Sequence, residues 1–300
     1  MSDEYRQGPV SRRGLTADEY ERVTQLATLC DRNDRITLKI NYDSLRARPG
    51  NEVNDFLYYE REELIGFLGL YQFNNHEIEI SGMVHPAHRR KGVFSALLSA
   101  AKQEVRQRGI SKLIFINETN SASGKSFLES LGAEYTFSEY WMKMTQIELP
   151  QMKHPIHLRL AMPEDIEVVA HMTAVCFDRN EAELLETMTK KRAGKKDHSV
   201  MLIELNGDAI GTLAMNHADE NSAFIYGFCV LPEHQGRGYG RQALALAIQT
   251  ALGLQRTNIE LEVACANDRA LSLYQSCGFD VMGANDYYVQ MLDDWPASNP

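Results

Sequence analysis

The feature that most constrains the fold of this chain is an internal repeat. Residues 84–92 (VHPAHRRKG) align with residues 230–238 (VLPEHQGRG) at an offset of 146 positions. The alignment continues to residues 140–144 and 287–291, where the offset has drifted by a single residue. A spacing held over roughly 60 residues indicates two copies of one folding unit rather than a single large domain.

The length of the chain agrees with two domains. Three hundred residues are enough for two units of about 150 residues, each with its own core. Pro150 and Pro155 lie between the copies, where prolines are typical of a linker. We therefore expect an N-terminal domain over residues 1–145, a linker over residues 146–155 and a C-terminal domain over residues 156–300.

The second copy has a clear order of secondary structure. Asn206-Gly207 separates two apolar runs and predicts a hairpin, and an apolar stripe from Ala243 to Ala251 predicts a helix. The expected strands are 156–160, 199–205, 209–215, 223–230, 258–263, 280–283 and 287–291. The expected helices are 163–176, 181–191, 238–252 and 268–276.

The first copy repeats this order. Thr16 and Glu19 form a capping-box pattern at the start of a helix over residues 15–30, and no clear strand precedes it. Strands are expected at 55–60, 64–73, 77–84 and 112–117, and a second helix at 92–109. Hairpins followed by β-α-β-α-β segments predict an α/β fold, with a mixed, mostly antiparallel sheet flanked by helices.

Composition is that of an ordinary soluble protein. The chain is 44% hydrophobic and 24% charged, and its net charge of −10 argues against a nucleic-acid or anionic-membrane binder. Residues 151–300 carry 12 Lys and Arg against 20 Asp and Glu, which suits a cationic substrate, although solubility explains the excess equally well. Five cysteines without metal-type spacing predict no metal site. We expect a cytoplasmic protein, and the sequence does not indicate its oligomeric state.

The segment Gln235-Gly236-Arg237-Gly238-Tyr239-Gly240 lies between an expected strand and an expected helix. Its alternate glycines leave backbone N–H groups unshielded at a helix N-terminus, where the partial positive charge also lies. Arg237 and Arg241 can add charge-assisted hydrogen bonds to phosphate. The segment therefore predicts a pyrophosphate cradle.

Three kinds of nucleotide site contain such a cradle. A P-loop is excluded because no Lys-Ser/Thr pair follows the glycines. A dinucleotide fingerprint fits in part, since Gly238, Gly240 and Ala243 match G-x-G-x-x-A and Glu260 lies twenty residues on. Against it, the preceding strand follows an antiparallel hairpin instead of opening a parallel βαβ unit.

The third kind of site accounts for more of the sequence. Residues 230–240 resemble motif A of the GNAT superfamily of N-acetyltransferases, V-x-P followed by Q/R-x-x-G-x-G/A, at every fixed position. Residues 267–279 resemble the second family signature, N-x-x-A-x-x-L-Y-x-x-x-G-F. Both motifs occur in the family's order, about 30 residues apart.

This resemblance implies acetyl-CoA as cosubstrate and assigns roles to the matching residues. The pantetheine arm would lie along Phe228, Cys229 and Val230, and the Val230 N–H would face the acetyl carbonyl. The resemblance implies that Asn267 contacts the cofactor and that Tyr274 protonates the departing thiolate. The residues implied for the phosphates are Gln235, Gly236, Arg237, Gly238, Tyr239, Gly240 and Arg241.

Several roles remain open at this level. Tyr274 shares an apolar stripe with its helix neighbours, so it is either a general acid or a core tyrosine. Cys229 has no assignable base and fits packing better than nucleophilic catalysis. The residue at the position of a catalytic Glu in some relatives is Phe224, so the base stays unassigned, with Tyr226, Glu262 and a water relay as alternatives.

The first copy departs from the motif. Phe94 stands where glycine or alanine is expected, and Phe127 replaces the tyrosine. Arg90 and Lys91 could still bind phosphate, and Glu79 could act as a base if its strand carried a bulge. We expect a structural first copy and chemistry in the second, a plan similar to that of the mycothiol synthases, whose substrate is not carried over.

The sequence therefore predicts an N-acetyltransferase that moves an acetyl group from acetyl-CoA to a small-molecule or peptide primary amine by direct attack. The alternative from another class is an acetyl-CoA-binding regulatory or scaffold protein with weak catalysis. A nicotinamide enzyme is the remaining alternative, and it predicts dinucleotide binding.

Overall fold

The computed structural model describes residues 7–147, 149, 153–191, 198–217 and 220–292. The chain divides into two compact units. The first unit comprises residues 1–138 and 283–300, and the second unit comprises residues 139–282. These units depart from the ranges expected from the repeat, 1–145 and 156–300, at the last strand of each half.

The first unit is built on a mostly antiparallel sheet; among its described strands, only the β4–β5 pair is parallel. In sheet order its strands are β1 (Gly8–Arg12), β2 (Asp55–Glu60), β3 (Glu63–Tyr71), β4 (Glu77–Val84), β5 (Lys112–Glu118) and the second part of β12 (Phe279–Met291). Its helices are α1 (Ala17–Asp34), α2 (Tyr42–Arg46), α3 (Val93–Gln107) and α4 (Ala122–Ser130).

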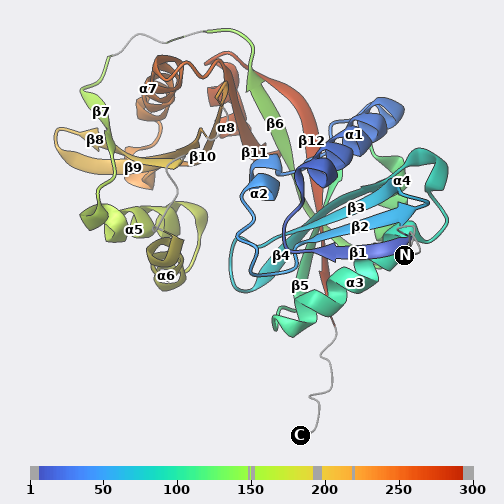
Figure 1. Ribbon diagram of the computed structural model, residues 1–300. Coiled ribbons are helices and arrows are strands. Elements are labelled where there is room, and N and C mark those ends of the chain that lie inside the picture. The colour runs from blue at the N-terminus through green and yellow to red at the C-terminus, as the bar shows by residue number, and fades with distance from the viewer. Residues whose placement is uncertain (1–6, 148, 150–152, 192–197, 218–219, 293–300) are drawn as a thin grey trace, which may run out of the picture. The chain divides into compact units, whose positions relative to one another are not determined.

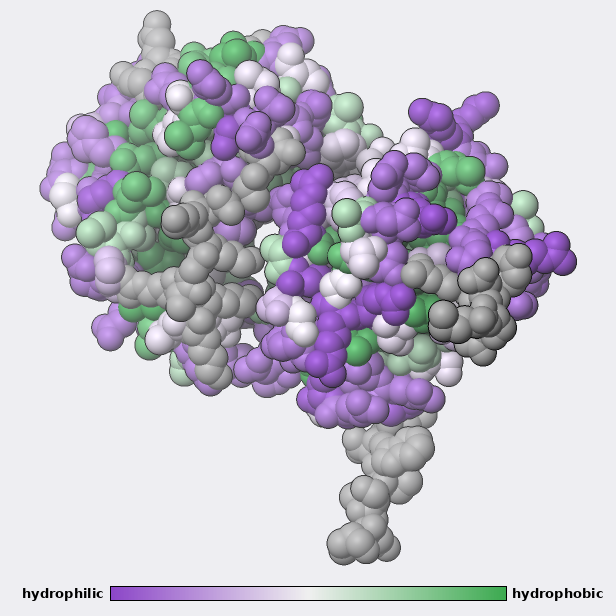
Figure 2. Space-filling view, in the orientation of Figure 1, coloured by the Kyte–Doolittle hydropathy of each residue, from purple (hydrophilic) through white to green (hydrophobic). Residues whose placement is uncertain are grey.

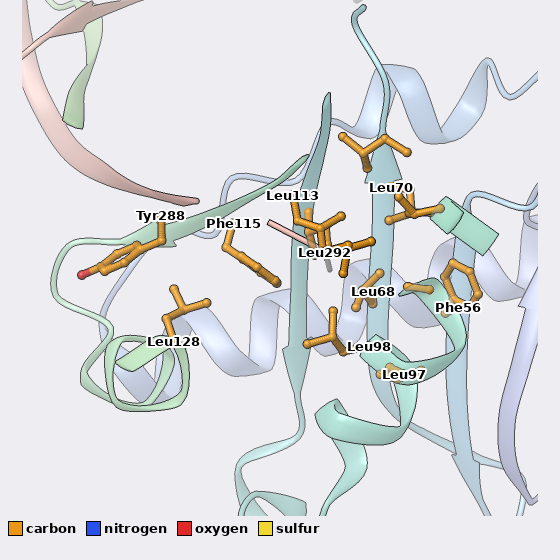
Figure 3. Close-up of a cluster of buried hydrophobic side chains, with 14 of the residues drawn as sticks. Phe56, Leu68, Leu70, Leu97, Leu98, Leu113, Phe115, Leu128, Tyr288 and Leu292 are labelled. Carbon is orange, nitrogen blue, oxygen red and sulfur yellow. The ribbon is translucent and has the colours of Figure 1, made fainter. Parts of the chain in front are cut away.

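The start of α1 confirms the expected capping box. The Glu19 N–H donates to Thr16 Oγ1 at 3.2 Å, and the Thr16 N–H donates to Glu19 Oε2 at 3.1 Å, so two N–H groups without helical partners are satisfied. Helix α3 packs Leu97 and Leu98 against Leu68 and Phe115 of the sheet. Figure 3 shows this cluster of buried side chains between helix and strands.

The second unit repeats the plan. In sheet order its strands are β6 (Glu134–Met144), β11 (Asn258–Ala264), β10 (Ser222–Val230), β9 (Asp208–Asn216), β8 (His198–Leu205) and β7 (Ile156–Leu160). Its helices are α5 (Ile166–Phe177), α6 (Glu181–Lys191), α7 (Tyr239–Gly253) and α8 (Asp268–Gln275). Within the part of this unit that the structure describes, only the β10–β11 pair is parallel. Figure 1 shows α5 and α6 on one side of this sheet and α7 on the other.

The two faces of this sheet carry different side chains. On what we name the α7 face, Ile225, Ile259 and Leu261 pack against the expected stripe of α7, which is fully buried. On the opposite face, named the α5 face, Leu202 packs against Val169 and Met172 of α5. Because strand side chains alternate, each strand position is assigned to one face.

The last strand of each half is exchanged. Residues 285–291 of β12 pair antiparallel with β5 of the first unit, and residues 139–143 of β6 pair with β11 of the second unit. The two strands expected at 280–283 and 287–291 are one continuous strand, β12. Each sheet is therefore completed by a strand from the other half of the sequence, and the compact units differ in this respect from the expected ranges 1–145 and 156–300.

The linker is held to α7 where the structure describes it. The side-chain oxygen of Gln242, a residue that is 4% exposed, accepts from the N–H groups of Lys153 and His154 at 3.0 and 2.9 Å. The Gln242 amide donates to the carbonyl of His154 at 2.6 Å. Residues 148 and 150–152 of the expected linker lie outside the described residues.

The elements expected from the sequence did not include β1, α2, α4 or β6. Strand β1 is an edge strand of five residues, and each of its two faces carries one polar side chain. It therefore lacks the apolar run that marks a buried strand.

Figure 2 shows hydrophilic and hydrophobic residues interspersed over the visible surface. Within the described ranges, no helix is long and apolar enough to cross a membrane.

Candidate functional site

The centre of the candidate site is a place where two parallel strands of the second unit stop pairing. The β10–β11 pairs run from Ser222↔Asn258 to Ile225↔Leu261 and then end, although β10 continues to Val230 and β11 to Ala264. On its other edge β11 stays paired with β6 as far as Ala264. We name the interval between the unpaired ends of β10 and β11 the β10–β11 gap.

A bulge in β10 accompanies the gap. The pairing of β10 with β9 shifts between Tyr226 and Cys229, and Gly227 has a φ of +57°. A bulge inserts one residue and reverses which face the following side chains take. Phe228 and Val230 consequently join the α7 face, and Cys229 lies on the α5 face with its Sγ toward the Met172 carbonyl.

The backbone of Val230 is directed into the gap. The Leu231 N–H donates to the Ile210 carbonyl at 2.8 Å, and Val230 pairs with Gly211 in the next register position. Because hydrogen-bonded and non-hydrogen-bonded pairs alternate in an antiparallel ladder, the N–H and C=O of Val230 point away from β9, toward β11. The strand geometry leaves this N–H outside the β9 ladder, and its contact with an acetyl carbonyl stays a prediction.

The glycine segment forms the turn between β10 and α7. Gly236 and Gly238 have φ values of +74° and +87°, in the left-handed region that favours glycine. Gly238 is the N-cap of α7, so the first N–H groups of that helix follow it directly. Gln235 fixes the turn to the strand, since its Nε2 donates to the Val230 carbonyl at 2.8 Å.

Exposed basic and polar groups surround this turn. Arg237 and Arg241 are exposed to solvent, Tyr239 is half-buried, and all three belong to the predicted phosphate-binding set. Asn267 is the N-cap of α8, where its side-chain oxygen accepts from the Ala270 N–H at 3.1 Å. This leaves the side-chain amide of Asn267 as the group that could contact a ligand.

Sequence reasoning missed one residue at the turn, His154. A Cβ on Gly238 would lie 3.2 Å from its Nε2, and the imidazole contacts the Tyr239 ring edge-on with centroids 4.9 Å apart. The backbone of His154 is held in place by Gln242. No motif links a residue to a turn some 85 positions away, and the buried Gln242 in an otherwise apolar helix stripe was the only local signal.

Tyr274 lies on α8 and faces the core of the second unit. It is 8% exposed, and its ring lies 6.4 Å from the Phe228 ring and 6.3 Å from the Phe279 ring. Burial raises the pKa of Tyr274 to about 12. Within the described part of the chain its hydroxyl has no hydrogen-bond partner. Contact with Phe228 places the ring beside the strand that borders the gap.

Cys229 is a poor candidate for a nucleophile. It is 9% exposed, and burial raises the pKa of its thiol to about 12. A nucleophilic cysteine needs the opposite, a lowered pKa from a nearby cation or base. Its neighbour Cys176 is also a free thiol, directed at the Val230 carbonyl at 3.7 Å. Both cysteines therefore serve packing, as the sequence indicated for Cys229.

The first unit keeps the backbone of this turn but not its side chains. Arg90 and Gly92, which correspond to Gly236 and Gly238, have φ values of +64° and +80°. Arg89 takes the place of Gln235, and its Nε donates to the Val84 carbonyl at 3.1 Å. The same guanidinium makes two hydrogen bonds to the carboxylate of Asp34, at 2.9 and 2.7 Å. Asp34 thus neutralises the positive charge that could otherwise bind a phosphate.

Each copy has an aromatic ring between this strand and the helix that follows the turn, but the ring comes from the strand in the second unit and from the helix in the first. In the second unit the ring is Phe228 on β10, and the helix opens with Gly240, whose Cβ would lie 3.8 Å from that ring. In the first unit the strand carries Gly82, and Phe94 on α3 covers it: a Cβ on Gly82 would lie 2.8 Å from Phe94 Cε2. Phe94 also packs edge-on against Phe127 at 5.1 Å.

The condition under which Glu79 could have served as a base is not met. The β3–β4 pairs run without a register shift from Gly66↔Val84 to Tyr71↔Glu79. Strand β4 is therefore regular over the stretch where β10 is bulged. The two copies differ by this one residue, which is why the offset between equivalent positions changes from 145 before Gly227 to 146 after it.

Comparisons with known proteins agree with the repeat. The model of the acetyltransferase (GNAT) family matches residues 20–133 and again residues 164–279. The mycothiol acetyltransferase of Kineococcus radiotolerans is 25% identical over 292 residues, covering 92% of this chain and 94% of that protein. The mycothiol acetyltransferase of Propionibacterium freudenreichii subsp. shermanii is 24% identical over 307 residues, covering 94% and 91%.

Solved structures share the fold at lower identity. A GCN5-related N-acetyltransferase from Sphaerobacter thermophilus has a TM-score of 0.76 and 16% identity, covering 94% of this chain and 95% of that one. A tandem GNAT protein from the clavulanic acid biosynthesis pathway has a TM-score of 0.69 and 15% identity, covering 96% and 99%. With both halves matched by one family model, this chain belongs to the acetyltransferase (GNAT) family as a tandem of two GNAT domains.

Proposed function

We propose that the second unit transfers an acetyl group from acetyl-CoA to a primary amine. One observation carries this proposal: the β10–β11 gap receives the backbone of Val230 and opens beside an intact glycine turn at the start of α7. A thioester arm in the gap and a pyrophosphate on the turn are the two ends of one ligand, coenzyme A. No other part of the described chain combines both features.

The residues at the site fit this ligand. The backbone of Phe228, Cys229 and Val230 would bind the pantetheine arm in place of the missing β11 partners. The N–H groups that follow Gly236 and Gly238 would hold the pyrophosphate at the positive end of α7. The side chains of Gln235, Arg237, Tyr239, Arg241 and Asn267 border the same ligand.

The Val230 N–H would stabilise the reaction. It is fixed by the strand and directed into the gap, so it can donate to the thioester oxygen as negative charge develops there. Such a donor needs no rearrangement during the reaction. Removal of one donor of this kind costs on the order of 100-fold in rate.

Tyr274 would supply the proton that the leaving thiolate needs. With its pKa raised to about 12 by burial, the phenol is fully protonated at neutral pH. A thiol has a pKa of about 8.5, so proton transfer from this phenol to the free thiolate is uphill, and it requires that the phenolate regain a proton from the acylated nitrogen as the C–S bond breaks. The contact of Tyr274 with Phe228 supports its placement beside the departing sulfur.

Direct attack by the amine fits the site better than a covalent intermediate. Cys229 lies on the strand that borders the gap, and its pKa of about 12 leaves almost no thiolate at neutral pH. The amine therefore attacks the thioester itself while both ligands are bound.

The first unit would serve as a structural partner. Phe94 occupies the start of α3 and covers Gly82, Phe127 lacks the hydroxyl of Tyr274, and Arg89 is bound to Asp34. Strand β6, from the first half of the sequence, completes the sheet of the second unit, so that sheet includes residues from both halves.

Release of free thiol from acetyl-CoA across a panel of primary amines tests the proposal. We expect turnover with at least one amine and none without amine. Tight acetyl-CoA binding without turnover on any amine would overturn the enzymatic function and leave a binding protein.

A further inference from the structure

The end of the linker forms a short segment, residues 153–155, that we name the linker strap. It contacts the first turn of α7 and leads into β7, which starts at Ile156 and pairs with β8. Pro155 restricts the backbone of the residue before it to extended conformations. His154 is therefore confined by the chain on its C-terminal side.

One side chain of α7 holds the linker strap. Gln242 is 4% exposed and has buried apolar neighbours on its helix, Ala243 and Leu244. Its Oε1 accepts from the N–H groups of Lys153 and His154 at 3.0 and 2.9 Å, and its Nε2 donates to the His154 carbonyl at 2.6 Å. A buried amide costs free energy unless it is hydrogen-bonded, so Gln242 and the strap backbone satisfy each other.

This clamp brings the imidazole of His154 onto the glycine turn. A Cβ on Gly238 would lie 3.2 Å from Nε2 and 3.8 Å from Cδ2, so the ring lies on the side where Gly238 carries only hydrogen. The ring also meets Tyr239 edge-on, with an interplanar angle of 81°. Tyr239 is the first residue of α7, and its N–H is one of those without a partner inside the helix. The imidazole thus lies next to the N–H groups that we expect to hold a pyrophosphate.

The imidazole is available to a ligand. His154 is half-buried, and within the described part of the chain its hydrogen bonds are made by its backbone alone. A ring nitrogen that carries a proton can donate to an anion. Because the strap and the Tyr239 ring already fix this side chain, it loses little freedom on binding. The exposed side chains of Arg237 and Arg241 have more freedom to lose.

Among the residues that the structure describes, the first unit has no equivalent of this clamp. A Cβ on Gly92, which corresponds to Gly238, would have nothing within 4 Å. The residue that corresponds to Gln242 is Ala96, whose side chain cannot hydrogen-bond a strap. The clamp and the imidazole therefore occur together, in the copy whose glycine turn is intact.

We propose that His154 is a phosphate ligand that the linker adds to the glycine turn, and that Gln242 is the positioning residue that holds it there. The proposal rests on the proposed function, in which the pyrophosphate of acetyl-CoA lies on this turn. The turn binds the phosphate oxygens through its backbone, and the imidazole adds a side-chain donor from outside the motif. A hydrogen bond to an ionised phosphate is among the stronger ones, and its loss costs roughly tenfold in affinity.

The kinetic effect of such a contact should appear in KM. The phosphates take no part in the bond exchange at the thioester, so a contact with them is equally strong before and during the reaction. Its loss therefore raises KM and leaves kcat unchanged. A cosubstrate without phosphate groups should be unaffected by the loss.

S-acetylpantetheine provides the comparison, since it carries the acetyl thioester on the same arm without phosphates. In His154→Ala we expect KM for acetyl-CoA to rise roughly tenfold at unchanged kcat. The value of kcat/KM for S-acetylpantetheine should change less than about twofold. His154→Gln keeps a side-chain donor and should recover part of the acetyl-CoA affinity. The matched control is His157→Ala, which removes an exposed imidazole from β7 and should act like the unaltered chain.

Gln242→Leu tests the positioning role. It removes the three hydrogen bonds to the linker strap, so KM should rise for acetyl-CoA and stay constant for S-acetylpantetheine. In the double variant with His154→Ala, KM for acetyl-CoA should be no more than about twofold above that of His154→Ala alone, because both residues act through one contact. A larger additional rise would overturn the positioning role of Gln242.

Two results in His154→Ala would overturn its role as a phosphate ligand while leaving acetyl transfer in place. One is an equal loss for both cosubstrates, and the other is an unchanged KM for acetyl-CoA. No transfer from either cosubstrate by the unaltered chain, with any amine, would overturn the proposed function and this proposal with it.

Discussion

Replacement of Tyr274 by phenylalanine separates the two roles that its position allows. The ring is packed between Phe228 and Phe279 and is 8% exposed, so the phenylalanine ring fits the same space. The hydroxyl has no hydrogen-bond partner within the described residues. Its loss should therefore change the free energy of unfolding by no more than about 1 kcal/mol, because the replacement breaks no hydrogen bond within the described residues.

The same replacement should be severe for catalysis if Tyr274 is the acid. General acid catalysis contributes on the order of 100-fold or more, which raises the barrier by about 2.7 kcal/mol. We expect kcat for thiol release to fall by that factor, with an unchanged acetyl-CoA dissociation constant and an unchanged melting temperature. With its pKa at about 12, Tyr274 should cause no loss of activity below about pH 11.

The control is Tyr288→Phe, which removes a hydroxyl from another buried tyrosine, one in the first unit that is 5% exposed. It should leave thiol release unchanged. An undiminished rate in Tyr274→Phe would assign the residue to the core and refute its role as acid. A rate loss that only matches a loss of folded protein would refute it as well.

Three further predictions concern the turn and the stability of the second unit. Gly240→Phe, which imitates Phe94, should reduce acetyl-CoA binding at least tenfold by calorimetry, because the ring enters the start of α7. His154→Ala should weaken acetyl-CoA binding roughly tenfold, the value of one charge-assisted contact to phosphate. Arg159 hydrogen-bonds Asp165 and holds the pKa of that carboxyl at about 2, below its unfolded value of about 3.9. The ionised carboxyl therefore stabilises the folded chain above about pH 4, and this contribution is lost as the pH falls from about 4 to 2. Asp165→Asn should remove it.

Each of these predictions has a control or a contrary result. His157→Ala removes an exposed imidazole from β7 and should leave acetyl-CoA binding unchanged; an equal loss there would remove His154 from the site. Undiminished binding in Gly240→Phe would contradict the position of the pyrophosphate. Parallel pH-stability curves for the unaltered chain and Asp165→Asn, measured by urea unfolding, would contradict the effect of Arg159.

Much of the fold follows from local patterns in the sequence. The capping box of α1, the apolar stripe of α7 and the Asn206-Gly207 hairpin each specify an element through contacts within it or next to it. The short elements β1, α2 and α4 escape such patterns, because a helix of five residues has barely one turn to display a period.

The exchange of β6 and β12 is beyond the reach of sequence patterns for a different reason. The repeat makes these strands alike, as residues 140–144 and 287–291 show. Each strand therefore fits the last position of either sheet. The sequence of a strand determines how the strand can pair, but it does not determine which of two similar sheets the strand joins. The choice depends on the whole chain.

At the site, the sequence predicted the elements and missed their geometry. The glycine turn, Val230 and Tyr274 were predicted by motif; the structure places the turn directly after β10 and the Tyr274 ring beside Phe228, and their functional roles stay predictions. The bulge at Gly227 was missed because a single inserted residue is visible only when the strands of both copies are paired residue by residue.

Calorimetric titration of the full-length chain with acetyl-CoA tests the central claim, that the second unit alone holds the cosubstrate for transfer. We predict one molecule bound per chain, with binding lost in Gly240→Phe and retained in Phe94→Gly. Two molecules per chain, or one molecule whose binding survives Gly240→Phe, would contradict the account.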